Sequence, residues 1–320
     1  MKKSSIAMIL GLSMMMVFTG CGSKKETKEE KNQPVAGSDT QIEDEATGVT
    51  DTPDVIESSS PWKEYKNYTF DYLCYEAIYA GDNAAVSVGY SGEIHYVGDD
   101  ESWPRSENQS LCRFGVESVG TNVFYSSGNG GMITKSTDGG KTFTKMQKFG
   151  DDEPNSCHIM SFCDENIGIA ASNTRIGLTT DGAASWTEIT LPECEDIICC
   201  RLASKDEFLY VDKAFNAFLT KDGGATWSTI ALNLPDTYEY VPLQKRVDIT
   251  IDGNDSYTVY CMDKKSGALK SFTTKDNFAT YSENVMPDTN VKVYYVHAKD
   301  DYISLYTPNT KNLIVYKYEG

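Results

Sequence analysis

Four aspartates recur along this sequence, and each lies in the same short pattern of hydroxyl and aromatic residues. Each Asp follows a Ser or Thr by two positions, and it precedes a second Ser or Thr by four positions and an aromatic residue by five. The copies occupy residues 136–143, 179–186, 220–227 and 274–281, around Asp138, Asp181, Asp222 and Asp276. A carboxylate can bind a metal ion or exchange a proton with a substrate. Copies that recur at a period would point away from one another, so a structural role is the favoured interpretation.

Each residue type in the pattern has a local role in a turn. An Asp in a tight turn accepts backbone N–H bonds from two residues further on, and the Ser or Thr adds side-chain-to-backbone bonds. Gly140 and Gly224 suit positions with a positive φ, which residues with a Cβ adopt only at a cost. The aromatic residue opens the next strand and can bury itself against a neighbouring sheet; it is Phe143, Trp186, Trp227 or Tyr281. We name these four segments the Asp turns and expect each to be a hairpin turn with its own hydrophobic anchor.

The Asp turns belong to a longer repeat of strands and turns. Before each one lie a strand-like run, an acidic or Asn-containing turn (the first turn), a second run, a polar turn (the second turn) and a third run. Six turns of each kind occur between residues 81 and 311, which predicts six four-stranded units. The expected fold is an all-β, six-bladed propeller over residues 61–320, with seven blades as the alternative. The last unit has only three runs, so we expect residues 61–70, anchored by Trp62, to complete it and close the ring.

The repeats resemble those of two known groups. The Asp turns resemble the Asp-box, or bacterial neuraminidase repeat, of sialidase-like propellers. Tyr90–Ile94, and Gly130–Ile133 followed by Ser136–Gly140, are similar to the repeats of the photosystem II stability and assembly factor group. The resemblance implies a propeller and is weak for function, because one fold hosts many activities. Sialidases share an aromatic-Arg-Ile-Pro motif near the domain start, which this sequence lacks, so sialidase activity is disfavoured.

Residues 1–20 are typical of a bacterial lipoprotein signal peptide. Two lysines precede an apolar run that is too short to span a bilayer, and Phe18-Thr19-Gly20-Cys21 resembles a lipobox. Cys21 is therefore the predicted lipidation site and membrane anchor. Residues 21–60 lack aromatic side chains and are rich in charged and hydroxyl residues, which predicts a disordered acidic linker. We expect the propeller to lie on the extracytoplasmic side of a bacterial cell membrane.

Composition and the remaining reactive side chains disfavour several functions. The formal net charge of −18 argues against binding of nucleic acid, which needs a basic footprint. The three histidines lie in different units without ligand spacing, so we predict neither a metal site nor a cofactor. The eight cysteines after Cys21 include no Cys-x-x-Cys pair, and we expect buried thiols. Cys194 with Cys199 or Cys200 is the one locally plausible disulfide.

Arginines supply the candidate binding residues. In a four-stranded blade the Asp turns share one face with the first turns, and related propellers usually function through the opposite face. Arg175, Arg201 and Arg246 fall in segments expected to reach that opposite face, where Tyr238 and Tyr240 could add an aromatic edge. Arginine on a rigid rim is a good receptor for carboxylates and aromatic rings. The plainer role for these arginines is to solubilise the rim or to pair with nearby acidic residues.

The function expected from these features is binding. We expect a monomeric, membrane-anchored binding or assembly-factor propeller that recognises a protein or a cell-envelope glycan without catalysing a reaction. The alternative is a glycan-active enzyme of the Asp-box type, either a glycoside hydrolase or a lyase. Paired carboxylates across a cleft would serve such an enzyme, and the many Asp and Glu residues neither select nor exclude a pair.

Overall fold

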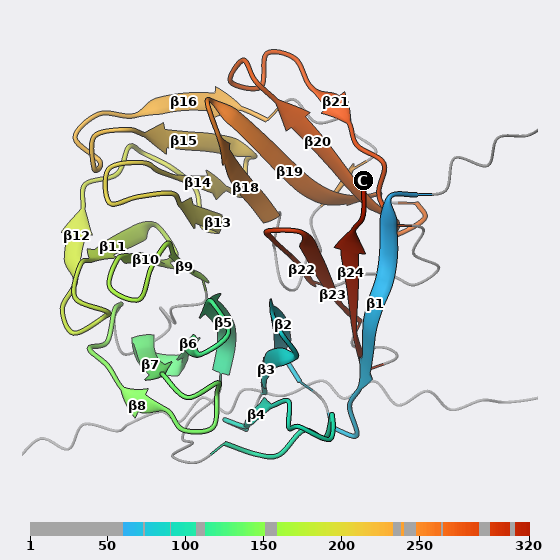
Figure 1. Cartoon of the computed structure of the whole chain (residues 1–320). Coiled ribbons are helices and arrows are strands. Elements are labelled where there is room, and N and C mark those ends of the chain that lie inside the picture. Colours follow the sequence, from blue (N-terminus) through green and yellow to red (C-terminus); the bar gives the residue numbers. More distant parts are fainter. Residues whose placement is uncertain are drawn as a thin grey trace, which may run out of the picture. The chain divides into compact units, whose positions relative to one another are not determined.

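Figure 1 shows a computed structural model of the chain, which separates into two compact units, Met1–Ile56 and Glu57–Gly320. The structure describes residues 60–320 apart from 73, 90, 107–112, 151–158, 233–237, 240–247, 264, 288–294 and 308–310. For Tyr238 and Glu239 it describes the backbone alone. The predicted signal peptide, Cys21 and the linker up to residue 59 lie outside the described residues. Within the described part of the chain, no helix is long and apolar enough to cross a bilayer.

Six antiparallel sheets are arranged around a central axis as the blades of a propeller (Figure 1). Blade 1 consists of β2 (Glu76–Gly81), β3 (Ala84–Val88) and β4 (Ile94–Tyr96), blade 2 of β5 (Arg113–Val119), β6 (Val123–Gly128), β7 (Met132–Ser136) and β8 (Thr144–Lys145), and blade 3 of β9 (Ile159–Phe162), β10 (Gly168–Ser172), β11 (Arg175–Thr179) and β12 (Thr187–Ile189). Blade 4 consists of β13 (Ile197–Leu202), β14 (Phe208–Asp212), β15 (Asn216–Thr220) and β16 (Ser228–Ala231), blade 5 of β18 (Asp248–Gly253), β19 (Ser256–Asp263), β20 (Leu269–Thr274) and β21 (Ser282–Glu283), and blade 6 of β22 (Tyr295–Lys299), β23 (Tyr302–Thr307), β24 (Asn312–Tyr318) and β1 (Trp62–Thr69). The predicted six-bladed fold is confirmed, and the alternative of seven blades is not.

Three details depart from a uniform set of four-stranded blades. In blade 1 an isolated bridge between His95 and Arg105 lies beyond β4, where the other blades have a fourth strand. In blade 5 a short extra strand, β17 (Tyr238–Glu239), pairs with the end of β19. A single 3-10 turn, η1 (Asn129–Gly131), connects β6 to β7. None of these changes the number of sheets around the axis.

The hydrophobic core is divided into six clusters, one between each pair of neighbouring blades. Between blades 1 and 2, for example, Val86 and Ile94 pack with Val116 and Phe124. Each blade therefore has a neighbour on both faces, and all residues of β14 are buried. This arrangement explains why the strands appear in the sequence as near-continuous apolar runs rather than as an alternating pattern.

The ring is closed by the first strand of the domain. β1 pairs along its length with β24, antiparallel, and becomes the outermost strand of blade 6. The indole Nε1 of Trp62 donates to the carbonyl oxygen of Val285, which follows the last strand of blade 5, at 3.0 Å. Two tryptophans of Asp turns reach the preceding blade in the same way, Trp186 to Gln147 at 3.0 Å and Trp227 to Thr190 at 3.2 Å. Trp62 thus takes in blade 6 the place that an Asp-turn aromatic residue takes in blades 3 and 4.

The four Asp turns share one hydrogen-bond pattern. In the first, Ser136 Oγ donates to Asp138 Oδ1 at 2.7 Å, and the Asp138 carboxylate accepts the N–H of Thr142 at 2.9 Å and its hydroxyl at 2.6 Å. The N–H of Gly140 donates to Ser136 Oγ at 2.9 Å. The same bonds recur around Asp181, Asp222 and Asp276. The carboxylate therefore bonds the residue four positions on, rather than two as expected, because the preceding hydroxyl takes the nearer N–H.

These carboxylates are engaged in stabilising the turns. Burial opposes the ionisation of Asp138, but hydrogen bonds from Thr142 and Ser136 hold the pKa of this carboxyl below its ordinary value. The N–H of Gly139 donates to the carbonyl of Asn122 at 2.9 Å, which ties the Asp turn to the first turn of the same blade. Equivalent bonds join Gly182 to Asn166 and Gly223 to Asp206. The Asp turns and the first turns therefore lie at the same end of the propeller.

The fourth Asp turn has a different hydrophobic anchor. Tyr281 is 38% exposed, whereas Phe143 of the first Asp turn is buried. Phe278 is buried in the cluster between blades 4 and 5 although its φ is 63°. The other turns have Gly or Ala at this position. The buried anchor of the fourth turn is thus Phe278, and the expectation that Tyr281 plays this part is wrong.

Candidate binding site in the central channel

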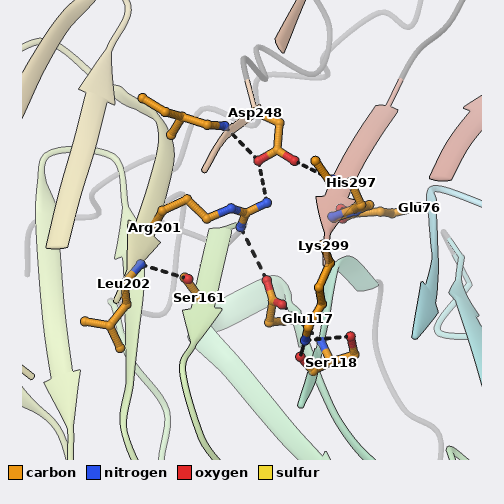
Figure 2. Close-up of polar contacts among 11 residues, drawn as sticks. Glu76, Glu117, Ser118, Ser161, Arg201, Leu202, Asp248, His297 and Lys299 are labelled. Atoms are coloured by element: carbon orange, nitrogen blue, oxygen red, sulfur yellow. Dashed lines mark hydrogen bonds and ion pairs between the residues drawn. The ribbon is translucent and has the colours of Figure 1, made fainter. Parts of the chain in front are cut away.

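The innermost strands of the six blades, β2, β5, β9, β13, β18 and β22, surround a central channel (Figure 1). Side chains alternate between the two sides of a strand, so each innermost strand contributes one set of side chains to the space around the axis. Figure 2 shows the polar side chains that meet there, and those that can ionise are Glu76, Glu117, Arg201, Asp248, His297 and Lys299. They form three linked groups of contacts.

Arg201 is the centre of the largest group. Its guanidinium forms an ion pair with Asp248 through Nη2 and a second with Glu117 through Nη1, the latter at 3.4 Å (Figure 2). The side chains of Arg201, Glu117 and Asp248 are only 17%, 10% and 4% exposed. Burial alone would lower the pKa of Arg201, but the carboxylates of Asp248 and Glu117 raise it above its ordinary value. Arg201 is therefore a permanent cation held between two carboxylates from blades 2 and 5.

Asp248 carries this group across to blade 6. Its Oδ1 accepts the N–H of Ile249 at 2.9 Å, and its Oδ2 accepts the N–H of Ala298, on β22, at 3.0 Å. On the other side of Arg201, the N–H of Leu202 donates to Ser161 Oγ of blade 3 at 3.0 Å. Side chains and backbone of β13 thus contact three other blades, and Asp248 extends the group to a fourth.

The other two groups also join different blades. His297 Nε2 lies 2.6 Å from Glu76 Oε1, and this hydrogen bond joins blade 6 to blade 1 with both side chains buried. Lys299 Nζ donates to the carbonyl oxygen of Ser118, and to its hydroxyl at 3.3 Å, which joins blade 6 to blade 2 (Figure 2). Every blade therefore has at least one polar contact with another blade around the channel, and the contacts of Arg201 with Glu117 and of Lys299 with Ser118 join blades that are not neighbours.

Two hollows lie along the channel. The smaller has a volume of about 30 Å³ and borders Arg201 and His297; it has room for about one water molecule. The larger, of about 340 Å³, is lined by residues from all six innermost strands, namely Ile78, Glu117, Ser161, Arg201, Thr250 and Lys299. Its lining also includes Gly120 and Asp300 of the first turns. This larger hollow, which we name the axial hollow, therefore lies at the Asp-turn end of the channel.

The structure separates the arginines that the sequence analysis grouped. Arg175, at the start of β11, forms two hydrogen bonds with Glu188, from Nε to Oε1 at 2.9 Å and from Nη2 to Oε2 at 2.5 Å. Arg201 is the fifth of six residues in β13 and borders the axial hollow. The expectation that Arg201 reaches the face opposite the Asp turns is wrong, because the link from blade 3 extends to residue 196 and β13 begins late. Arg246 and Tyr240 lie outside the described residues, as does the side chain of Tyr238.

Sequence reasoning missed most of the channel residues. Glu117, Asp248, His297 and Lys299 were not singled out, nor was Glu76. A usable signal existed in the sequence, since Glu117 and Arg201 each stand next to apolar or small residues within an innermost strand. A charged residue in a buried strand is costly unless it is paired, so two of opposite sign in different repeats indicate a pair.

Other chemistry is sparse in the described part of the chain. Within it, no group of three or more His, Cys, Asp and Glu side chains is placed to hold a metal ion. Of the cysteines that the structure describes, six are free thiols, among them Cys194, Cys199 and Cys200. The plausible local disulfide is therefore not formed in this structure.

The fold and the channel define a class of protein: a six-bladed β-propeller whose inner strands are joined around the central channel by buried polar contacts. The chain belongs to the Sortilin/Vps10 family, since the model described as "Sortilin, neurotensin receptor 3" matches residues 131–316, more than half of the chain. No curated protein matches the sequence.

Several solved propellers are similar to this chain. YCF48 bound to D1 peptide is 12% identical, with a TM-score of 0.53 over 81% of this chain and 96% of that one. The WD40 propeller domain of Doa1 is 10% identical, with a TM-score of 0.54 over 81% and 97%. Virginiamycin B lyase from Staphylococcus aureus is 13% identical, with a TM-score of 0.53 over 75% and 79%. At these identities the similarity shows the propeller fold alone.

Proposed function

We propose that this protein is a membrane-anchored, extracytoplasmic binding protein that takes an anionic group of a protein or cell-envelope glycan into the axial hollow. The observation that carries the proposal is the position of the hollow, which is lined by all six innermost strands and borders two cations, Arg201 and Lys299. Its volume of about 340 Å³ is near the lower end of small-molecule sites. A space of this size suits one side chain, one chain end or one sugar unit of a larger partner.

Lys299 supplies the charge for this recognition. An ammonium has three N–H donors, and the acceptors of Lys299 in Figure 2 are two neutral oxygens of Ser118. The charge of Arg201, by contrast, is offset by Glu117 and Asp248. A carboxylate or another acidic group of a partner therefore gains more binding free energy from Lys299 than from Arg201.

The comparisons support binding as the general activity. The description of the family model names a receptor, and one similar propeller was solved with a peptide bound. The polar contacts around the channel also support it, because they join the inner strands of different blades and a preorganised site loses less free energy on binding.

Membrane attachment is supported by the sequence of the N-terminus. Cys21 follows an apolar run and resembles the lipidated residue of a lipobox. Replacing Cys21 with Ser is expected to release the protein from the membrane fraction and to abolish incorporation of a fatty-acid label. A variant that stays in the membrane fraction and still incorporates the label would contradict lipidation at this residue.

The binding proposal is tested by comparing the wild-type chain with a Lys299→Gln variant on a glycan array and in pull-downs with a purified candidate partner. Loss of one charge-assisted hydrogen bond costs about 1.5–3 kcal/mol, so binding is expected to weaken about 10- to 100-fold. Lys145→Gln is the control, because Lys145 is an exposed lysine on β8. Equal binding by the two variants would contradict the role of Lys299, and turnover of a bound glycan by the wild type would favour the enzyme alternative.

A further inference from the structure

Blade 2 contains a row of buried polar side chains without hydrogen-bond partners. The guanidinium nitrogens Nε, Nη1 and Nη2 of Arg113 and the hydroxyls of Ser126 and Thr134 are all in this state among the described residues. Each of the three residues has an exposed fraction of 0%. A buried polar group without a partner is costly, and an unpaired ion is much more so. Groups of this kind in a folded protein indicate a partner that has not been identified.

The strand register places the three side chains on one face of the sheet. Arg113 pairs with Gly128, and Ser126, two residues before Gly128, pairs with both Val116 and Thr134. Paired residues of antiparallel strands share a face, as do residues two apart on one strand. Arg113, Ser126 and Thr134 therefore project from the same face. Gly128, the strand partner of Arg113, adds no side chain to this face, and the register shifts between Arg113 and Gly115.

This face of blade 2 packs against blade 1. Val116 and Phe124, on the same face, belong to the cluster that also contains Val86 and Ile94 of blade 1. The backbone N–H of Arg113 donates to the carbonyl of Gly89, also in blade 1, at 3.2 Å. The orphaned donors thus lie at the seam between two blades, away from the axial hollow and its cations.

The charge of Arg113 needs a counterion. Burial lowers the pKa of Arg113 to about 10, so the guanidinium remains protonated at neutral pH. Arg201 in the channel is also largely enclosed, with a side chain 17% exposed, but two carboxylates offset its charge. No acidic side chain among the described residues forms an ion pair with Arg113. Three guanidinium nitrogens and two hydroxyls, all of which can donate, match an acceptor that carries negative charge.

We propose that the seam between blades 1 and 2 holds a small inorganic anion, of the size of chloride, bound by the guanidinium of Arg113 and the hydroxyls of Ser126 and Thr134. The anion would neutralise the buried cation and act as a structural ligand of the propeller. This site is separate from the binding function proposed for the axial hollow, and either proposal can fail without the other.

The test is the dependence of stability on chloride. The full-length chain is unfolded with urea at constant ionic strength while sodium chloride replaces sodium gluconate. An anion that binds only the folded state raises the ratio of folded to unfolded protein, by about 100-fold when its concentration is 100 times the Kd. Arg113→Met is expected to remove this dependence. Lys145→Met, which removes one exposed positive charge from the same blade, is expected to keep it.

A second measurement decides the matter if Arg113→Met does not fold. Crystals of the wild-type chain grown with sodium bromide are expected to show an anomalous peak within hydrogen-bonding reach of the Arg113 guanidinium. Stability that does not change with chloride, or a crystal in which a carboxylate of the chain itself contacts Arg113, would overturn the proposal. Residues 151–153 are acidic, so their combined replacement by amides provides the corresponding variant: destabilisation by that change, with no effect of chloride on the wild type, would identify an internal counterion instead.

Discussion

Replacement of Arg201 with Met tests whether the paired charges of the channel stabilise the ring. The substitution keeps a long side chain but leaves Glu117 and Asp248 as buried carboxylates without their cation. Removing one partner of a buried ion pair costs about 3–5 kcal/mol. Asp248 retains backbone hydrogen bonds from Ile249 and Ala298, and Glu117 retains one from Ser118. We therefore expect a loss at the lower end, about 3 kcal/mol in the free energy of unfolding.

Urea denaturation measures this loss directly. With an m-value of about 3 kcal/mol/M, the midpoint of unfolding should fall by about 1 M. Arg175→Met is the matched control, because Arg175 also forms two hydrogen bonds with a carboxylate, but that pair is 33% and 50% exposed. An exposed pair contributes about 0–1 kcal/mol, so the control should shift the midpoint little.

A compensating variant separates the charge effect from lost packing. Adding Glu117→Gln and Asp248→Asn to Arg201→Met removes the two unpaired charges and should recover at least half of the lost stability. The reasoning is refuted if Arg201→Met and Arg175→Met shift the midpoint equally, or if the triple variant is less stable than Arg201→Met alone.

Two further substitutions and one labelling experiment test other parts of the fold. Asp138→Asn should lower the free energy of unfolding by about 1 kcal/mol at pH 7. Because folding lowers the pKa of Asp138, the difference in stability between variant and wild type should shrink as the pH falls below about 4. A difference in urea midpoint that stays constant from pH 7 to 3 would contradict this. Trp62→Phe removes the hydrogen bond from the indole to the carbonyl of Val285 and should lower the free energy of unfolding by about 1 kcal/mol. An unchanged thermal midpoint would indicate that this hydrogen bond contributes nothing. Native-state maleimide labelling followed by peptide mass spectrometry should modify exposed Cys163 and spare Cys74, whose pKa burial raises to about 12; preferential labelling of Cys74 would show that blade 1 opens.

The fold was predictable because its determinants are local and repeated. The Asp turns use residues within eight positions of one another, and their recurrence defines the period of the blades. Closure by the strand after Pro61 followed from the same pattern, since Trp62 stands where a repeat would place an aromatic residue. Within the turns, local reasoning erred where a tertiary contact decides, as when Phe278 rather than Tyr281 enters the core.

The site was not predictable in the same way because it depends on contacts between repeats. Arg201 meets residues far away in the sequence, Glu117 and Asp248, and no local pattern specifies which inner strands face one another. The position of Arg201 along its strand also depends on the length of the link before β13, which shifts the residue toward the Asp-turn end. Arg113 shows the same limit, since its lack of a partner is visible only once its burial is known.

The pairing of β1 with β24 has a consequence for the order in which the protein folds. Trp62 and Tyr318 pair near the two ends of the domain. Among the strands of the domain β1 is synthesised first, but it can pair only after β24 has been made. Such distant contacts form late, because the entropy of closing the loop must be overcome before they stabilise the structure. Until β24 has been made, β1 lacks the strand with which it pairs, and the apolar faces that blades 5 and 1 turn toward blade 6 are incompletely covered. A chain truncated before β24 would keep an unpaired strand and these apolar faces exposed, and both favour aggregation.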